Sequence, residues 1–243
     1  MKDKIGNLKL NISKNKEDAA KLASEQINKA LDDFNNKNIL FLVSGGSAFD
    51  ILKGVSLDSL NEKMTIAVLD ERYDKTNKNN NFSQLKKTDF YKNALSKSCE
   101  FIDTSVKEDQ TEEELADFFN DKLKDWRNKN PQGKILATLG VGKDGHTSGI
   151  MPFVGDESGF NELFEGDRFV VFYDASGKNE HTKRVTTSNT FLRLIDEVVV
   201  YLVGSEKKEA FKHLQENVKV SDMPAKIILD LKGTVYVDNN VAK

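Results

Sequence analysis

Four short, mainly apolar runs stand out along the chain, at 39–43, 64–69, 135–139 and 198–203. Runs that are apolar on both faces are typical of buried strands. Because segments with helical spacing separate these runs, the pattern favours parallel pairing with helices packed against the sheet. We therefore expect an α/β fold with a mainly parallel sheet and helices on both faces.

The segment 16–34 predicts a long amphipathic helix, because its apolar residues recur every three or four positions. Asn15 is a suitable N-cap, and Glu17 and Asp18 place negative charge in the first turn. The polar stretch 74–81 is expected to form a surface loop. Further expected elements are helices over 48–55, 111–128 and 206–217, and peripheral strands over 169–173 and 234–237.

The composition is that of a globular protein, with 38% hydrophobic and 31% charged residues among 243. Without repeats or a Pro/Ser-rich linker, a chain of this length is expected to form a single domain over residues 1–243. Its net charge of −3 provides no basic excess for nucleic acid. The lone Cys99 and three scattered His give neither a disulfide nor a zinc or iron–sulfur ligand set. Catalysis would therefore rest on carboxylates, a histidine, cations and backbone dipoles.

The N-terminal segment and the longest apolar runs indicate where in the cell the protein is expected. The first 20 residues lack the apolar core of a signal peptide. No apolar run approaches the roughly 20 residues needed to span a bilayer. The expected location is therefore the cytoplasm, with no membrane partner.

Two of the apolar runs end in loops whose residues suit a ligand. Gly45, Gly46 and Ser47 follow the first run and precede a predicted helix, so backbone N–H groups there could cradle a phosphate. A plain turn from strand to helix is the alternative. Asp70 and Arg72 follow the second run, and such charges are costly to desolvate unless they serve one another or a ligand. An exposed cluster of ion pairs is the alternative there.

The loop 139–152 is the most informative stretch, because it places Asp144 two residues before His146 among small and flexible residues. An acid near an imidazole can orient and polarise it, and a histidine is suited to general-base work at neutral pH. The formal G-x-G-x-x-G at 140–145 does not indicate a dinucleotide fold, because Gly149 and Pro152 leave no room for the helix that must follow. No serine lies in a G-x-S-x-G nucleophile elbow.

Two later cations and the other histidines complete the candidates. Arg184 precedes a short predicted helix. Lys207 falls in the first turn of another, where a cation opposes the helix dipole unless it meets an anion. A solvated lysine is the alternative. His181 lies in a polar segment that leads towards Arg184 and could line the same pocket, whereas His213 fits an exposed helix surface.

Several of these segments, in this order and spacing, resemble the 6-phosphogluconolactonase family over nearly the whole chain. They are VSGGSAFDIL (43–52), LDERY (69–73), LGVGKDGHTSGIMP (139–152), KRVTTSNTFLRLIDEVVVYLVGSEKKEAF (183–211) and MPAKIIL (223–229). The D-G-H-T segment with its flanking glycines is the most specific of them. The resemblance implies a modified Rossmann-like fold. It also implies hydrolysis of 6-phospho-D-glucono-1,5-lactone to 6-phosphogluconate in the oxidative pentose phosphate pathway, without metal or organic cofactor.

The resemblance also suggests roles for the candidate residues. Gly45, Gly46 and Ser47 would bind the phosphate, with Arg184 and Lys207 closing around it. The implied partner is thus a small sugar phosphate, and the protein would act as a monomer or a small homo-oligomer.

The remaining candidates would act on the lactone ring or on the shape and charge of the site around it. His146 would take a proton from the attacking water and return one to the leaving ring oxygen. Asp144 would orient His146 or bind sugar hydroxyls. Arg72 would bind the phosphate or stabilise the oxyanion, and Asp70 would act mainly on loop structure.

Two other functions stay open. The related amino-sugar phosphate isomerases and deaminases typically carry a Glu just before the Pro that follows D-G-H, and this chain has Met151 there. A non-catalytic sugar-phosphate sensor is disfavoured, because Asp144 and His146 are both present and no DNA-binding segment is attached. The segment 148–151 departs from the usual lactonase pattern, which puts the shape of the sugar pocket in question.

Overall fold

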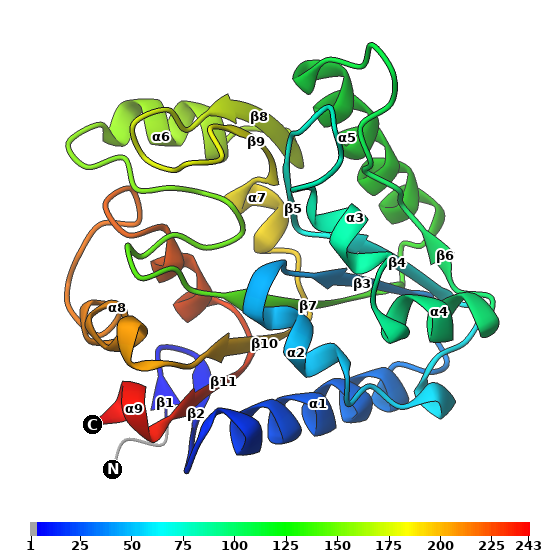
Figure 1. Cartoon of the computed structure of the whole chain (residues 1–243), viewed down its shortest axis with the longest axis horizontal. Helices are drawn as coiled ribbons and strands as arrows, with labels where there is room; N and C mark the ends of the chain where they lie inside the picture. Colours follow the sequence, from blue (N-terminus) through cyan, green and yellow to red (C-terminus); the bar gives the residue numbers. More distant parts are fainter. Residues whose placement is uncertain (1–3) are drawn as a thin grey trace.

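A computed structural model describes residues 4–243 of the chain (Figure 1), and its centre is a sheet of eight strands in the order β1-β2-β11-β10-β7-β3-β4-β6. All neighbours pair in parallel except β1 and β2, which form an antiparallel edge. The strands are β1 (Lys4–Ile5), β2 (Leu8–Ser13), β3 (Ile39–Val43), β4 (Met64–Val68), β6 (Glu100–Phe101), β7 (Lys134–Gly140), β10 (Glu197–Leu202) and β11 (Gly233–Asp238).

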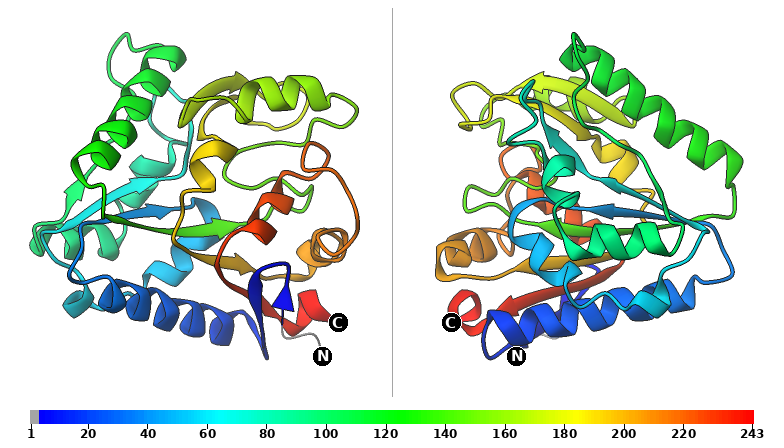
Figure 2. Two further views of the ribbon diagram at one scale, coloured as in Figure 1. Left: turned by 180° about the vertical axis from the view of Figure 1, so that it is seen from behind. Right: turned by 45° about the vertical axis from the view of Figure 1, so that its right-hand side comes forward.

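Helices cover both faces of this sheet, as the apolar runs predict. Alternate residues of β3 enter two different cores: Ile39, Phe41 and Val43 pack on one face, and Leu40 and Leu42 on the other. The first face is covered by α1 (Lys16–Asp33), α2 (Phe49–Leu52), α3 (Asn81–Leu85) and α4 (Asp89–Ser96). The second is covered by α5 (Glu112–Lys129), α6 (Glu157–Phe164), α7 (Asn189–Leu192), α8 (Lys208–His213) and α9 (Asn239–Ala242). Figure 2 shows α1 and α5 on opposite sides of the sheet.

A second, antiparallel sheet lies on the α5 side, with the order β5-β9-β8. Its strands are β5 (Asp70–Arg72), β8 (Val170–Asp174) and β9 (Lys183–Thr187). Short 3-10 helices complete the fold at η1 (Gly46–Ala48), η2 (Leu57–Ser59), η3 (Ser205–Lys207) and η4 (Pro224–Asp230). Because β5 follows β4 directly, the small sheet joins the end of the large one and brings β9 near the carboxyl ends of the central strands.

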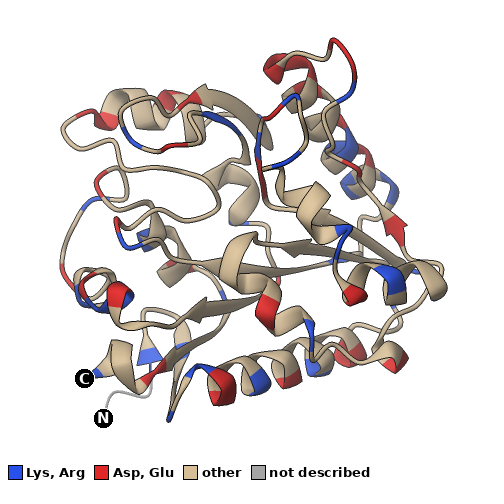
Figure 3. Ribbon diagram, in the orientation of Figure 1, with Lys and Arg blue, Asp and Glu red and all other residues tan. Residues whose placement is uncertain are grey.

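The helix cap predicted at Asn15 is confirmed. The Asn15 side chain accepts a hydrogen bond from the Asp18 amide at the start of α1. At α5, Thr111 and Glu114 form a reciprocal capping box. Such caps satisfy amide groups that have no partner within the helix. Figure 3 shows charged residues along α1 and α5, whereas the middle of the large sheet carries almost none.

Three sequence expectations are wrong, and one of them is the helix over 48–55, since α2 ends at Leu52. The run 234–237 is not peripheral: it lies in β11, between β2 and β10, and all six residues of that strand are buried. The helix expected over 206–217 is also shorter, since α8 ends at His213. There, the Lys226 ammonium donates hydrogen bonds to the Leu214 and Glu216 carbonyls, which take the place of further helix bonds.

The order in which strands are added to the sheet reverses between β3 and β7, which are neighbours in the sheet. After β3 the chain continues to β4 on one side, and β7 and β10 lie on the other. Loops that leave the carboxyl ends of two such strands diverge and form a crevice where ligands bind in open α/β sheets. Among the helices of residues 4–243, none is long and apolar enough to cross a membrane.

Candidate active site

A cavity of about 210 Å³ lies in this crevice, where the loops after β3, β4 and β7 meet. Eight of the nine residues predicted for the site line it: Gly45, Gly46, Ser47, Asp70, Arg72, His146, Arg184 and Lys207. The ninth, Asp144, contacts His146. The fold thus gathers candidates that lie up to 162 positions apart, from 45 to 207, around one small space.

Asp144 and His146 form a hydrogen-bonded pair at the edge of the cavity. The distance between Asp144 Oδ1 and His146 Nδ1 is 2.5 Å, and the same oxygen accepts a bond from the His146 amide at 3.2 Å. Their side chains are 38% and 32% exposed, so solvent still reaches the pair. With Nδ1 held by a carboxylate, Nε2 is the nitrogen that can take a proton from water.

The environment of Asp144 keeps its carboxyl ionised. Partial burial alone would raise its pKa, but the hydrogen bonds and the charge interaction with His146 outweigh burial and lower the pKa to about 2. The carboxylate is therefore present at neutral pH, and it can stabilise an imidazolium that forms during a reaction.

The lowered pKa of Asp144 predicts how stability changes in acid. A carboxyl with a pKa of about 2 in the folded chain and about 3.9 in the unfolded chain stabilises the fold above pH 4. This contribution declines as the pH falls towards 2. We expect the free energy of unfolding of the wild type to exceed that of Asp144→Asn at pH 5, and the difference to shrink as the pH falls below 4. Urea titrations of both proteins measure it, and an undiminished difference at pH 2 contradicts the expectation.

Hydrogen bonds within the turn and from neighbouring strands hold the turn after His146 in place. Ser148 and Gly149 both have positive φ, +48° and +68°, and the turn closes with a bond from the Ile150 amide to the Thr147 carbonyl at 2.8 Å. Ser148 Oγ lies 3.0 Å from Thr187 Oγ1, and the Tyr173 hydroxyl donates to the Gly149 carbonyl at 2.6 Å. The contacts from β8 and β9 therefore fix the position of this turn beside the cavity.

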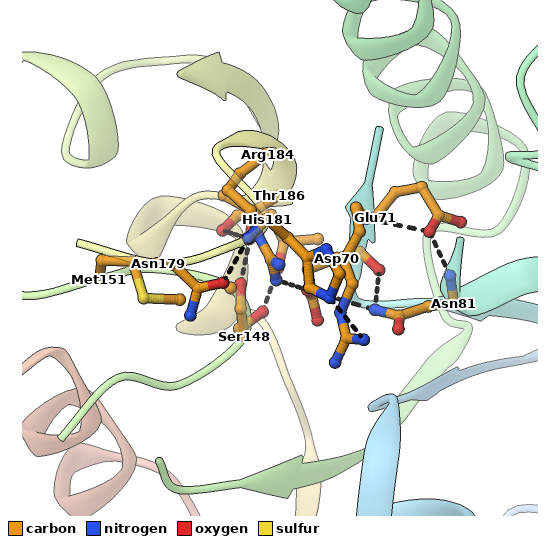
Figure 4. Close-up of polar contacts among 12 residues, drawn as sticks. Asp70, Glu71, Asn81, Ser148, Met151, Asn179, His181, Arg184 and Thr186 are labelled. Atoms are coloured by element: carbon orange, nitrogen blue, oxygen red, sulfur yellow. Dashed lines mark hydrogen bonds and ion pairs between the residues drawn. The ribbon is translucent and has the colours of Figure 1, made fainter. Parts of the chain in front are cut away.

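An ion pair between Asp70 and Arg184 forms one wall of the cavity (Figure 4). Both side chains are almost completely buried, at 7% and 5% exposed. Asn81 donates from Nδ2 to the Asp70 carbonyl at 2.9 Å and to its carboxylate at 3.3 Å. Gly149 must lack a side chain here, since a Cβ would lie 2.7 Å from both Asp70 Oδ2 and Arg184 Nη2.

Glu71, the residue after Asp70, points away from the cavity and connects β5 to α3. Its carboxylate accepts bonds from the amides of Asn81 and Phe82 and from the Thr104 hydroxyl. Burial raises the pKa of Glu71 to about 8, against these hydrogen bonds, which favour the charged form. We therefore assign Glu71 a structural role, in which it supports the cavity wall that contains Asp70.

The glycine loop after β3 forms the opposite wall. Ser44 ties it to β7, with bonds from its amide to Thr138 Oγ1 at 3.0 Å and from its hydroxyl to the Thr138 carbonyl at 2.8 Å. At Gly45, a Cβ would lie 2.6 Å from Asn81 Cγ, so only glycine permits this approach. The loop can therefore present its backbone to a ligand at close range.

The charges that line the cavity are mainly positive. Arg72, Arg184 and Lys207 face a single lining carboxylate, that of Asp70. In the part of the chain that the structure describes, neither Arg72 nor Lys207 has an ion-pair partner. The Nε groups of Arg72 and Arg184 are buried without a hydrogen-bond acceptor. Burial also lowers the pKa of Lys207 from its usual value. Unpaired buried donors of this kind are costly unless an anion binds them.

Sequence reasoning did not single out two of the polar side chains that line the cavity, Asn81 and Ser148. Asn81 and Ser148 line the cavity, but one lies in a polar run and the other in a run of small residues, and neither has a signal of its own. His181 was a candidate for the lining of the pocket, but it does not line the cavity; it contacts the Arg72 side chain. Within residues 4–243, no group of three or more His, Cys, Asp or Glu side chains could hold a metal ion.

Comparison with known proteins agrees with this architecture. Residues 13–237 match the model of a family described as glucosamine-6-phosphate isomerases/6-phosphogluconolactonase. The chain is 29% identical over 213 residues to a probable 6-phosphogluconolactonase of Dictyostelium discoideum, covering 85% of this chain and 87% of that protein.

Two solved structures show how closely the fold is shared. A 6-phosphogluconolactonase from Shewanella baltica OS155 superimposes with a TM-score of 0.77 at 22% identity, covering 96% of this chain and 99% of that one. A 6-phosphogluconolactonase from Trypanosoma brucei gives 0.77 at 15% identity, with 97% of each chain covered. The modified Rossmann-like α/β fold expected from the sequence is thereby confirmed. The chain belongs to the glucosamine-6-phosphate isomerase/6-phosphogluconolactonase family.

Proposed function

We propose that this protein hydrolyses 6-phospho-D-glucono-1,5-lactone to 6-phosphogluconate. One observation carries the proposal: the Asp144–His146 pair stands at the edge of a cavity that also holds three cations and a glycine loop. A base for water and a site for a dianion are the two functions that this hydrolysis requires. The names of the relatives described above support the same reaction.

The phosphate of the substrate binds between the glycine loop and the cations. Three cations and one carboxylate give the cavity lining a net charge of +2, which matches the charge of a phosphate dianion. Arg184 already pairs with Asp70. The cations left for the phosphate are therefore Arg72 and Lys207, with Arg184 fixing the wall behind them.

His146 then acts on the lactone carbonyl. Its Nε2 takes a proton from a water molecule as the water oxygen bonds to C1. The C1–ring oxygen bond breaks next, and the imidazolium returns the proton to that oxygen. Asp144 holds the imidazole in position and stabilises its charged form between the two steps.

The position of Met151 favours a lactonase over an isomerase or deaminase of the same family. Met151 is only 1% exposed, and its amide donates to the Tyr173 hydroxyl at 3.0 Å. A thioether cannot exchange a proton, so this position provides no second acid or base for the opening of an amino-sugar ring. The chemistry left to the site is hydrolysis with a single histidine.

We also propose how the chain is organised, where the protein works and what it binds. The chain acts as one domain, because both hydrophobic cores pack on a single large sheet. The protein works in the cytoplasm as a monomer or a small homo-oligomer. Its partner is a sugar phosphate and not a nucleic acid, since the formal net charge is −3.

A timed assay tests the reaction directly. Hydrolysis of freshly made 6-phosphogluconolactone is followed with and without the protein, so that the spontaneous rate is subtracted. We expect acceleration that EDTA does not remove, and no release of ammonia from glucosamine 6-phosphate. Ammonia release without lactone hydrolysis would assign the chain to the deaminases.

Lys207→Ala is expected to separate phosphate binding from ring chemistry. The loss of a half-buried ammonium removes a charged partner worth about 1.5–3 kcal/mol, or roughly tenfold to a hundredfold in KM for the phosphorylated lactone. Hydrolysis of unphosphorylated gluconolactone should hardly change. Lys208→Ala, whose parent side chain is exposed and lies outside the cavity, is the matched control. Equal effects of Lys207→Ala on both lactones would contradict a role in phosphate binding.

A further inference from the structure

Arg72 and Arg184 are directly opposite one another in the register of β5 and β9. Opposite residues of an antiparallel pair project on the same face, and like charges in that position repel. Asp70 compensates Arg184, with which it forms an ion pair, whereas Arg72 has no such partner among residues 4–243. Arg72 is therefore an arginine that needs another group to keep its guanidinium in place until a ligand arrives.

His181 contacts that guanidinium. Its Nε2 lies 3.4 Å from Arg72 Nη1. A guanidinium can only donate hydrogen bonds, so this nitrogen accepts from Arg72 when the imidazole is neutral with its proton on Nδ1. The carboxylate of the exposed Glu180 lies 3.5 Å from the same nitrogen and favours the charged ring. Burial, followed by the positive charge of Arg72, lowers the pKa of His181 and favours the neutral ring. The carboxylates of Glu180 and Asp74 act in the opposite direction more weakly, and Arg184 reinforces the lowering.

The β8–β9 hairpin fixes the place of His181. The Ala175 amide donates to the Thr182 carbonyl at 2.5 Å and closes the hairpin loop. Asn179 Oδ1 accepts a bond from the His181 amide at 3.0 Å, as Figure 4 shows. The histidine side chain is 25% exposed, against 85% for its neighbour Glu180. Of these two adjacent residues, the histidine is therefore the one that the loop turns towards the site.

We propose that His181 is a positioning residue, which holds the Arg72 guanidinium ready for the phosphate of the substrate. The inference rests on the proposed function and adds to it a residue outside the cavity. Without His181, the Arg72 side chain is free to leave the cavity and must be ordered again when the phosphate binds. Ordering one such side chain costs roughly threefold to tenfold in affinity.

Steady-state kinetics test this role in the full-length protein. The values of kcat and KM are measured for the wild type, His181→Ala, His181→Leu and His181→Gln, on both 6-phosphogluconolactone and unphosphorylated gluconolactone. We expect Ala and Leu to raise KM for the phosphorylated substrate by roughly threefold to tenfold and to leave kcat within about twofold. Gln keeps an acceptor oxygen and should restore most of the affinity. His213→Ala removes a histidine on α8 that lies outside the cavity and serves as the control.

Three outcomes would overturn the proposal. They are an unchanged KM in both His181→Ala and His181→Leu, an equal rise of KM for the two lactones, and a fall in kcat with KM unchanged. The last would place Arg72 at the oxyanion instead of the phosphate. A wild-type protein that hydrolyses neither lactone overturns the proposed function, and calorimetric binding of 6-phosphogluconate to the same variants then tests His181 separately. Melting temperatures measured beforehand show which variants fold, and the Leu variant retains the bulk of the side chain.

Discussion

Replacing His146 by alanine is expected to lower kcat for lactone hydrolysis by about 10²–10⁴-fold, the usual contribution of a general base. The reason is geometric: Asp144 binds Nδ1 at 2.5 Å, which leaves Nε2 as the only nitrogen of the ring that can activate water. KM should change little, because the residues that we propose to bind the phosphate, Arg72 and Lys207, lie in other segments that line the cavity. The measurement is kcat after subtraction of the spontaneous rate.

A matched control is His213→Ala, which removes an imidazole that is 56% exposed on α8. It should leave kcat unchanged. Turnover of His146→Ala near that of the wild type would remove the histidine from the mechanism. A melting temperature equal to that of the wild type shows that any loss of rate is a loss of chemistry and not of folded protein.

The second large effect is expected at Arg184. Arg184→Ala leaves the Asp70 carboxylate buried without its partner, and breaking a buried ion pair in this way costs about 3–5 kcal/mol. For a chain of this size, each kcal/mol corresponds to a fall of about 2–4 °C in melting temperature. The variant should therefore melt roughly 6–20 °C below the wild type.

Two further variants make this result specific. The double variant Asp70→Ala with Arg184→Ala has no unpaired charge to bury, so it should be more stable than Arg184→Ala alone. Lys219→Ala breaks an exposed ion pair with Glu157, at 2.8 Å, and should shift the melting temperature very little. If the single and double variants melt at the same temperature, the pair does not act as the structure indicates.

The sheet and the general place of the site could be predicted from the sequence, for a physical reason. The run 39–43 coincides with β3, and the other three runs match β4, β7 and β10 to within one residue at each end. Strands buried on both faces are mainly apolar along their whole length, so their pattern differs clearly from that of amphipathic helices. The loops after them meet because the carboxyl ends of parallel strands share an edge.

Other features depend on neighbours that the local pattern does not reveal. β11 was expected at the periphery, but an apolar run near the end of a chain can take a central place when strands such as β2 and β10 flank it. The partnership of Asp70 with Arg184 depends on the register of β5 with β9, over 114 positions of sequence. Arg72 likewise meets His181 across 109 positions of sequence. No periodicity within one segment predicts such pairings.

The two outermost strands of the large sheet, β1 and β6, contain two residues each. A strand at the edge of a sheet exposes backbone groups with which another molecule can pair, and long edges promote aggregation. β1 pairs only with Leu8 and Lys9 of β2, so the rest of that edge, from Leu10 to Ser13, has no strand beside it among the described residues. The sheet that forms the crevice at its centre thus keeps a four-residue stretch of open backbone at its β2 border, which is the length of a short strand.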